Sequence, residues 1–157
     1  MSSPCDNKSV GIIVKNNEGV LLIERKKFPF GFAAPAGHID DHGSFEDAAE
    51  AELKEETGLT ADSLTLLLEE RKENKCRREG GSWHYWKVYE AEVSGNLSLS
   101  KSETKQAGWY NYDDLMRLAQ KTQNYLNKNI SDEEWEREPG LEPVWFEFFK
   151  ELKILPK

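Results

Sequence analysis

Short runs of apolar residues near the start of the chain predict β-strands. Residues 10–15 and 20–25 are rich in valine, isoleucine and leucine, and the turn-forming sequence Asn-Asn-Glu-Gly separates them at 16–19. This arrangement favours a hairpin. Prolines and glycines then interrupt residues 29–37, which we expect to form a loop with at most a brief strand.

Further β-type runs follow in the middle of the chain. Residues 64–71 and 83–93 predict two longer strands, with the polar stretch 72–82 as the loop between them. A shorter strand is expected at 108–110, just before a helix that begins near Asp113. These strands and the early hairpin would together supply most of a sheet.

The last third of the chain predicts a polar excursion and then a closing helix. Residues 120–134 are polar and favour loops, whereas residues 143–153 have an amphipathic pattern with Pro143 in the first helical turn. Strands and helices do not alternate strictly along the chain. We therefore predict an α/β fold with a mixed β-sheet covered by helices, formed as a single domain over residues 1–157.

One helix is predicted with both of its ends. Ser44 is a suitable N-cap, Asp47 follows three residues later, and Gly58 suits the position after the last turn, so a helix is expected from Phe45 to Thr57. At 100° per residue, one broad face combines apolar and acidic side chains. Its members are Phe45, Ala48, Ala49, Glu52, Leu53 and Glu56.

Glu52 and Glu56 therefore extend the stripe that should pack inward. Like charges at this spacing repel, and burial of uncompensated carboxylates is unfavourable. Basic side chains or a hard divalent cation would compensate them, while a solvated acidic face is the simpler alternative. The preceding loop, residues 35–44, contains glycines that allow close approach of the backbone, and a carbonyl near Gly37 is a candidate cation ligand.

Composition narrows the classes of partner. The 157 residues include 38% apolar and 32% charged side chains, with 21 basic against 29 acidic residues and a net charge of −8. This balance argues against a nucleic-acid polymer as partner but is compatible with a phosphorylated small molecule bound together with a cation. We find no membrane span and no secretory signal, and we expect a cytoplasmic protein. Cys5 and Cys76 form a poor disulfide framework and lack metal-ligand spacing.

The sequence from Gly37 to Leu59 resembles the Nudix box, G-x5-E-x7-R-E-U-x-E-E-x-G-U, in which U is a bulky aliphatic residue. Seven positions match: Gly37, Glu52, Leu53, Glu55, Glu56, Gly58 and Leu59. Two differ, because Gly43 occupies the position of the first glutamate and Ala51 that of the arginine. These two side chains commonly pair in the family, so their joint absence is compatible with an intact fold, whereas loss of one would strand a charge.

The resemblance implies the α/β/α sandwich called the Nudix fold. It also implies hydrolysis of a nucleoside diphosphate linked to another group, usually with Mg2+, for which Mn2+ is an alternative. By the same resemblance, Glu52 and Glu56 are metal ligands, and Glu55 is a third ligand or a general base. Glu103 matches a carboxylate that in some members binds metal or activates water, and Gly37 would contribute its carbonyl.

Substrate-binding residues are predicted less directly. Arg25 ends a strand that resembles the family's and is a candidate for the outer phosphate. His84 and Trp86 alternate along their strand and would face a base or sugar, although an aromatic residue in a mixed sheet is more often part of the core. The basic stretch after residue 70 offers further cations: Arg71, Lys75, Arg77 and Arg78. The region 135–149 is rich in aromatic residues and favours packing or a subunit contact, which leaves a homodimer open.

The leading hypothesis from the sequence is thus a Mg2+-dependent Nudix pyrophosphohydrolase. Nucleotide sugars and nucleoside triphosphates, including oxidised ones, are candidate substrates, and the absence of proline from residues 60–80 weighs against ADP-ribose in particular. The departures at Gly43 and Ala51 motivate the alternative, a Nudix-fold nucleotide-binding module with weak or lost catalysis.

Overall fold

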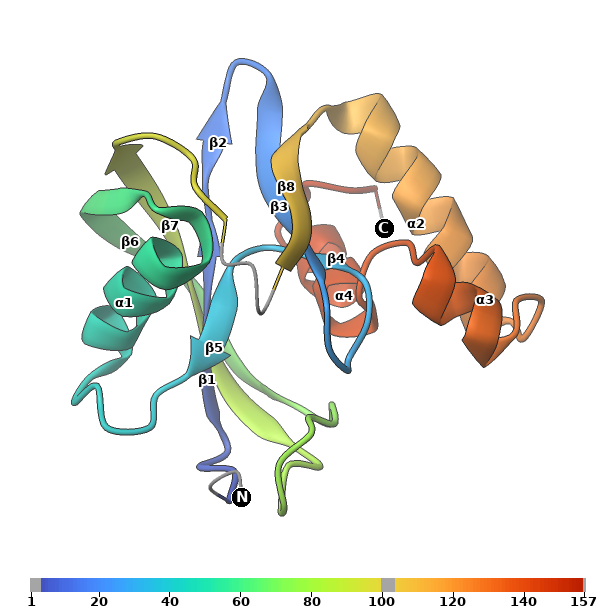
Figure 1. Ribbon diagram of the computed structural model, residues 1–157, viewed down its shortest axis with the longest axis horizontal. Coiled ribbons are helices and arrows are strands. Elements are labelled where there is room, and N and C mark those ends of the chain that lie inside the picture. Colours follow the sequence, from blue (N-terminus) through green and yellow to red (C-terminus); the bar gives the residue numbers. More distant parts are fainter. Residues whose placement is uncertain (1–3, 100–103, 157) are drawn as a thin grey trace.

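Two four-stranded β-sheets form the centre of the protein. The computed structural model describes residues 4–99 and 104–156 (Figure 1). The first sheet has the order β5 (Ala36–His38), β1 (Lys8–Ile13), β7 (His84–Ser94) and β6 (Thr60–Lys72). β1 and β7 are parallel, while the β1–β5 and β6–β7 pairs are antiparallel. The sheet is therefore mixed, as the sequence predicted.

The second sheet is built around β3 (Gly19–Arg25). It pairs with β2 (Lys15–Asn16), β4 (Phe32–Ala33) and β8 (Thr104–Tyr110). The expected hairpin joins β2 to β3, and Asn16 Oδ1 closes its turn by accepting from the backbone N–H groups of Glu18 and Gly19. The predicted strand 10–15 is divided, because the chain leaves the first sheet after Ile13 and enters the second at Lys15.

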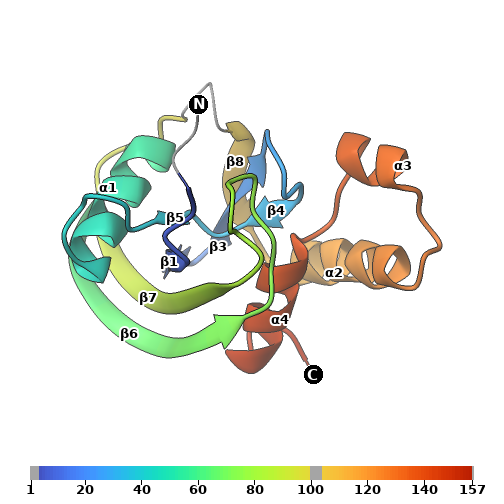
Figure 2. The same cartoon turned by 90° about the horizontal axis from the view of Figure 1, so that it is seen from below.

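Helices cover the sheets on opposite sides, which gives an α/β/α arrangement. α1 (Phe45–Thr57) packs on β1, β5 and β6. α2 (Tyr112–Leu126), α3 (Asp132–Arg137) and α4 (Pro143–Glu151) lie on the other side (Figures 1 and 2). None of these helices is long and apolar enough to cross a membrane, as judged over the described residues.

β1 has buried side chains on both faces. Val10 and Ile12 belong to the core beneath α1, whereas Ile13 belongs to the core beneath α2 and α4. Gly11 lies under the Trp145 ring, and a Cβ atom at Gly11 would be 2.2 Å from that ring. This alternation follows from the period of a strand, in which successive side chains point to opposite faces. The two apolar cores therefore lie on opposite faces of β1.

The prediction of loops over residues 120–134 is wrong for most of that stretch. α2 continues to Leu126, and α3 begins at Asp132. α2 starts with a complete capping box between Asn111 and Asp114. Its buried residues, Leu115, Ala119 and Thr122, recur at helical spacing while the remaining polar residues face outward. A helix with so narrow an apolar stripe resembles a loop in composition.

Candidate functional site

A cavity of about 640 Å3 opens beside α1 and β5. Its lining contains seven of the described residues to which the sequence assigned a role: Arg25, Gly37, Glu52, Glu55, Glu56, His84 and Trp86. Glu103 lies outside the described residues. Side chains predicted from four separate stretches of sequence thus share one site.

α1 positions the carboxylates as its sequence predicted. Ser44 Oγ accepts a hydrogen bond of 3.0 Å from the backbone N–H of Asp47, and Gly58, with φ of 77°, donates to Lys54 O at 2.9 Å. Three apolar side chains on the inward face, Ala48, Ala49 and Leu53, are fully buried. They fix the rotation of the helix, so the acidic end of the same stripe faces the cavity.

Glu52 lies directly against the backbone of β5. A Cβ atom at Gly37 would be 2.2 Å from Glu52 Cδ and 2.6 Å from each of its carboxylate oxygens. Only glycine therefore fits at position 37 with Glu52 in this place. The Nε2 atom of His42 is 3.8 Å from Glu52 Oε1, and the Glu52 side chain keeps 17% of its surface exposed.

Glu56 lies one helical turn further on and is buried, with 7% exposure. Its Oε2 accepts a hydrogen bond of 3.2 Å from the backbone N–H of Ala36. Glu55, also on the cavity lining, is exposed. The two carboxylates beside a glycine backbone offer oxygen atoms, which are the donor type that hard divalent cations prefer.

Part of the cavity lining is basic. Lys75, Arg77 and Arg78 line the cavity, together with Arg25, whose Nε donates to Pro29 O at 2.7 Å. Arg78 forms a two-fold hydrogen-bonded ion pair with Asp40 and lowers the pKa of that carboxyl.

Of the basic residues considered from the sequence, Arg71 is absent from the lining. Its guanidinium lies 4.2 Å from the centre of the Trp83 ring, and its Nε donates to Glu73 at 2.8 Å. The other cations named from this stretch, Lys75, Arg77 and Arg78, line the cavity together with the carboxylates.

His84 and Trp86 form part of the cavity wall but present little surface, with 1% and 5% exposure. The Trp86 ring packs edge-on against Trp145 and Phe148, at centroid distances of 5.7 and 5.3 Å. Its Nε1 donates to Asn74 Oδ1 at 3.1 Å. The more common alternative for an aromatic residue in a mixed sheet, a place in the core, is thus realised for Trp86.

Several residues of the lining were not expected from the sequence, among them Glu142 and Phe28. Glu142 is the N-cap of α4 and accepts a hydrogen bond of 3.2 Å from the Val144 N–H. Burial raises the pKa of its carboxyl to about 7, although the positive charge of Arg25 acts to lower it. The glutamate before Pro143 was a signal for this cap. Phe28 is the aromatic residue of the lining with an open face, being 44% exposed. Nothing in the local sequence pattern distinguished Phe28 from the other residues of its loop.

The two departures from the Nudix box leave α1 intact. Gly43 adopts a φ of +96° in the exposed loop, and a Cβ atom there would meet only Asp47 Oδ2, at 3.6 Å. Ala51 is partly buried and does not line the cavity. Both helix ends are capped without a pair between these positions. This agrees with the expectation that joint loss preserves the fold.

Known structures of similar shape identify the fold of the protein. The MutT protein from Methanosarcina mazei Go1 aligns with a TM-score of 0.66 at 15% identity, covering 98% of this chain and 96% of that one. A MutT Nudix hydrolase from Burkholderia pseudomallei aligns with a TM-score of 0.59 at 25% identity, covering 71% of this chain and 86% of that one. The fold is the Nudix fold.

The sequence comparisons extend this result from fold to family. The model of the NUDIX domain matches residues 6–132, and the chain belongs to the Nudix family. The ADP-ribose pyrophosphatase of Methanocaldococcus jannaschii is 33% identical over 111 residues, 69% of this chain and 63% of that protein. The 8-oxo-dGDP phosphatase of Mus musculus is 32% identical over 107 residues, 64% of this chain and 31% of that protein. The chain thus spans less than two thirds of the length of these curated relatives.

Proposed function

We propose that the protein is a metal-dependent pyrophosphohydrolase that cleaves a nucleoside diphosphate linked to another group. The observation that carries this proposal is the position of the Glu52 carboxylate against Gly37, in a cavity that is also lined by Glu56 and by basic side chains. Acidic and basic groups in one cavity suit a substrate whose phosphates require both a cation and direct positive partners.

Glu52 and Glu56 are the side chains that would hold the cation, with the Gly37 carbonyl and Glu55 as further ligands. A divalent cation bound there would neutralise the oxygens of the pyrophosphate and polarise the phosphorus that water attacks. Mg2+ is the ion we propose, because these ligands are oxygen atoms and a phosphorylated substrate supplies the rest of its coordination.

The chain's own residues would supply the remaining functions. Glu55, exposed on the lining, would accept the proton of the attacking water, and Glu103 is the second candidate for this role. Arg25, Lys75 and Arg77 would bind the outer phosphate. Attack at one phosphorus would then release a nucleotide and a second phosphorylated product.

The substrate class follows from the size and charge of the site. A cavity of about 640 Å3 lies within the range of nucleotide-sized ligands. Two of the relatives act, by their names, on ADP-ribose and on 8-oxo-dGDP, and one structural neighbour, the NUDIX domain of Shewanella oneidensis NrtR, was solved with ADP-ribose. The net charge of −8 favours such small phosphorylated molecules over a nucleic-acid polymer. A cytoplasmic location and a homodimer stay predictions.

The second candidate function is a Nudix-fold nucleotide-binding module without turnover. The observation that favours it is the absence of the glutamate and arginine at Gly43 and Ala51, because in the family the arginine helps to orient the metal-binding carboxylates. Glu46 and Asp47 lie in the first turn of α1, close to Gly43 in the sequence. Glu46 already accepts a hydrogen bond of 2.6 Å at Oε1 from the Tyr89 hydroxyl.

One experiment separates the two functions. The protein is incubated with Mg2+ and a panel of ADP-ribose, other nucleotide sugars and ordinary and oxidised nucleoside triphosphates, and phosphorus NMR follows the products. The enzyme proposal predicts turnover that Glu56→Gln abolishes and Glu50→Gln preserves, since Glu50 lies on the same helix but away from the cavity. Tight nucleotide binding with no product on any substrate would support the module instead. Full activity in Glu103→Gln would remove that residue from the mechanism.

A further inference from the structure

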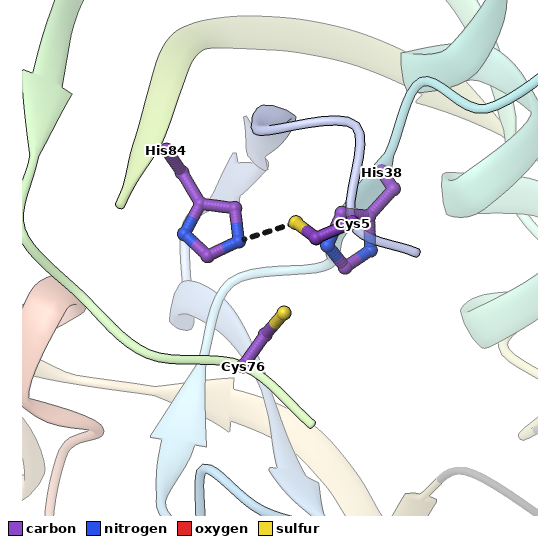
Figure 3. Close-up of side chains that lie close together, drawn as sticks. All are labelled: Cys5, His38, Cys76 and His84. Carbon is purple, nitrogen blue, oxygen red and sulfur yellow. Dashed lines mark hydrogen bonds between the residues drawn. The ribbon is translucent and has the colours of Figure 1, made fainter. Parts of the chain in front are cut away.

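Four metal-ligand side chains gather at the edge of the cavity. The chain contains two cysteines and three histidines, and Cys5, His38, Cys76 and His84 converge on one point (Figure 3). One donor atom from each lies within 4.8 Å of a donor atom from every other. These side chains come from four segments: the N-terminal stretch, the end of β5, the β6–β7 loop and the start of β7. The spacing argument from the sequence missed this group because the fold, rather than a short motif, brings it together.

His84 is oriented as a ligand would be. Its Nδ1 atom is 2.9 Å from Asn74 O and 3.2 Å from Asn74 Oδ1. Both partners are acceptors, so Nδ1 carries the proton and Nε2 keeps a lone pair. Nε2 points at Cys5 Sγ, 3.3 Å away. Metal-binding histidines commonly hold their second ring nitrogen against a carbonyl in this way.

The other three side chains present donor atoms to the same point. His38 Nε2 is buried, and among the described residues it has no hydrogen-bond partner. Cys5 Sγ accepts from the backbone N–H of Asn7 at 3.3 Å. Cys76 occupies the space next to Gly81, where a Cβ atom would be 2.2 Å from Sγ. A bound metal ion would give this buried nitrogen, which lies beside two thiols, the partner that buried polar atoms normally have.

Backbone hydrogen bonds preassemble the segments that carry the cysteines. The Cys5 N–H donates to Glu79 O, and the Cys76 N–H donates to Gly81 O, both at 2.8 Å. Asn7 Nδ2 donates to Gly80 O and Trp83 O at 2.9 and 2.8 Å. The N-terminal segment is therefore fixed to the β6–β7 loop without help from an ion, and both sulfur atoms face the two imidazoles.

We propose that Cys5, His38, Cys76 and His84 form a structural zinc site. Two sulfur and two nitrogen donors in a compact group match the tetrahedral ligand set that Zn2+ prefers. Bonds of about 2.3 Å to sulfur and 2.0 Å to nitrogen place neighbouring donors about 3.3 to 3.8 Å apart. The Cys5–His84 pair already meets this spacing at 3.3 Å, and the other pairs, which lie within 4.8 Å, need to close by at most about 1 to 1.5 Å. On binding, both thiols would release their protons to solvent.

The site would act on the cavity through the β6–β7 loop. His38, Cys76 and His84 belong to the cavity lining, and the loop also carries Lys75 and Arg77. Four protein ligands leave no open position on the ion, so its role is to fix the loop and not to take part in hydrolysis. The proposal does not rest on the proposed function, since it concerns a sulfur-nitrogen site and not the carboxylates of α1.

The test begins with wild-type protein prepared with zinc and then freed of unbound metal. Elemental analysis measures zinc per chain, and X-ray absorption at the zinc edge identifies the ligands. We expect about one zinc per chain, bound by two sulfur and two nitrogen atoms, and retained in excess Mg2+ because a hard cation prefers oxygen ligands. Zinc bound by oxygen and nitrogen alone, or no bound zinc, would overturn the proposal.

Variants locate the site without relying on one substitution. Cys76→Ser and His84→Gln should each lose most of the zinc, while His42→Gln, which alters the one histidine outside the group, should keep it. If a variant fails to fold, titration of the folded metal-free wild type with Co2+ replaces it, and thiolate-to-cobalt absorption is the expected result. Undiminished zinc in both the cysteine and the histidine variant, or no cobalt binding by the metal-free protein with both cysteines reduced, would refute the site.

Discussion

Gly37→Ala should damage catalysis far more than stability. The new Cβ atom would lie 2.2 Å from Glu52 Cδ, whereas ordinary contacts begin near 3.4 Å, so the carboxylate must retreat by about 1 Å. The group that moves is the end of a side chain, and the backbone of β5 can stay in place. A displacement of this size at a reacting centre costs about 100-fold in rate, which corresponds to about 2.7 kcal/mol.

The assay compares kcat/KM for hydrolysis of the substrate found in the panel, together with Mn2+ affinity measured by electron paramagnetic resonance. Gly108→Ala is the matched control, because a Cβ atom at this strand glycine would meet only Tyr110 Cε2, at 3.8 Å. We expect a loss of about 100-fold and weaker Mn2+ binding in Gly37→Ala alone. Thermal unfolding shows whether each variant is folded. Activity and Mn2+ affinity within threefold of wild type in a folded Gly37→Ala protein would refute the placement of Glu52 as a ligand.

Other predictions concern the cavity walls. Phe28→Ala should raise KM about fivefold with little change in kcat if its exposed ring stacks on the base, and an unchanged KM would exclude that role. Trp86→Ala should lower the free energy of unfolding by about 3–5 kcal/mol in denaturant titration, because the ring packs against Trp145 and Phe148; a loss below 1 kcal/mol would contradict this packing. The pKa of Glu142 is raised from its ordinary value of 4.5 to about 7 in the folded state. Between these two pH values the folded protein keeps a proton that the unfolded chain releases. The contribution of this group to stability is therefore lost as pH rises from about 4.5 to 7. Glu142→Gln should therefore flatten that part of the stability–pH curve, and a curve identical to wild type would disprove the shift.

Local signals in the sequence predicted α1 and the acidic part of the site well. Ser44 and Gly58 fix the ends of the helix, and the alternation of alanines with glutamates fixes its inward face, so the positions of Glu52 and Glu56 followed from helical geometry alone. The β2–β3 hairpin was equally local, because Asn16 and Gly19 determine its turn. These features depend on residues a few positions apart, which pattern analysis can relate.

Features that depend on distant contacts were not predictable in the same way. The exposed surface of Phe28 and the raised pKa of Glu142 depend on which segments close over them. The Cys5, His38, Cys76 and His84 group joins side chains up to 79 positions apart. The start of α2 near Asp113 was predicted, but its end was missed for a different reason: over residues 120–126 the buried residue is Thr122, and most of the other side chains are polar.

The central claim is that a divalent cation is bound between the carboxylates of α1 and the backbone of β5. Crystals soaked in Mn2+ and measured at a wavelength where manganese scatters anomalously test it directly. The account predicts an anomalous peak that contacts Glu52 and Glu56 beside Gly37, and the absence of that peak from Glu56→Gln crystals. Fully occupied Mn2+ elsewhere, with no peak beside these two glutamates in the wild type, would contradict it.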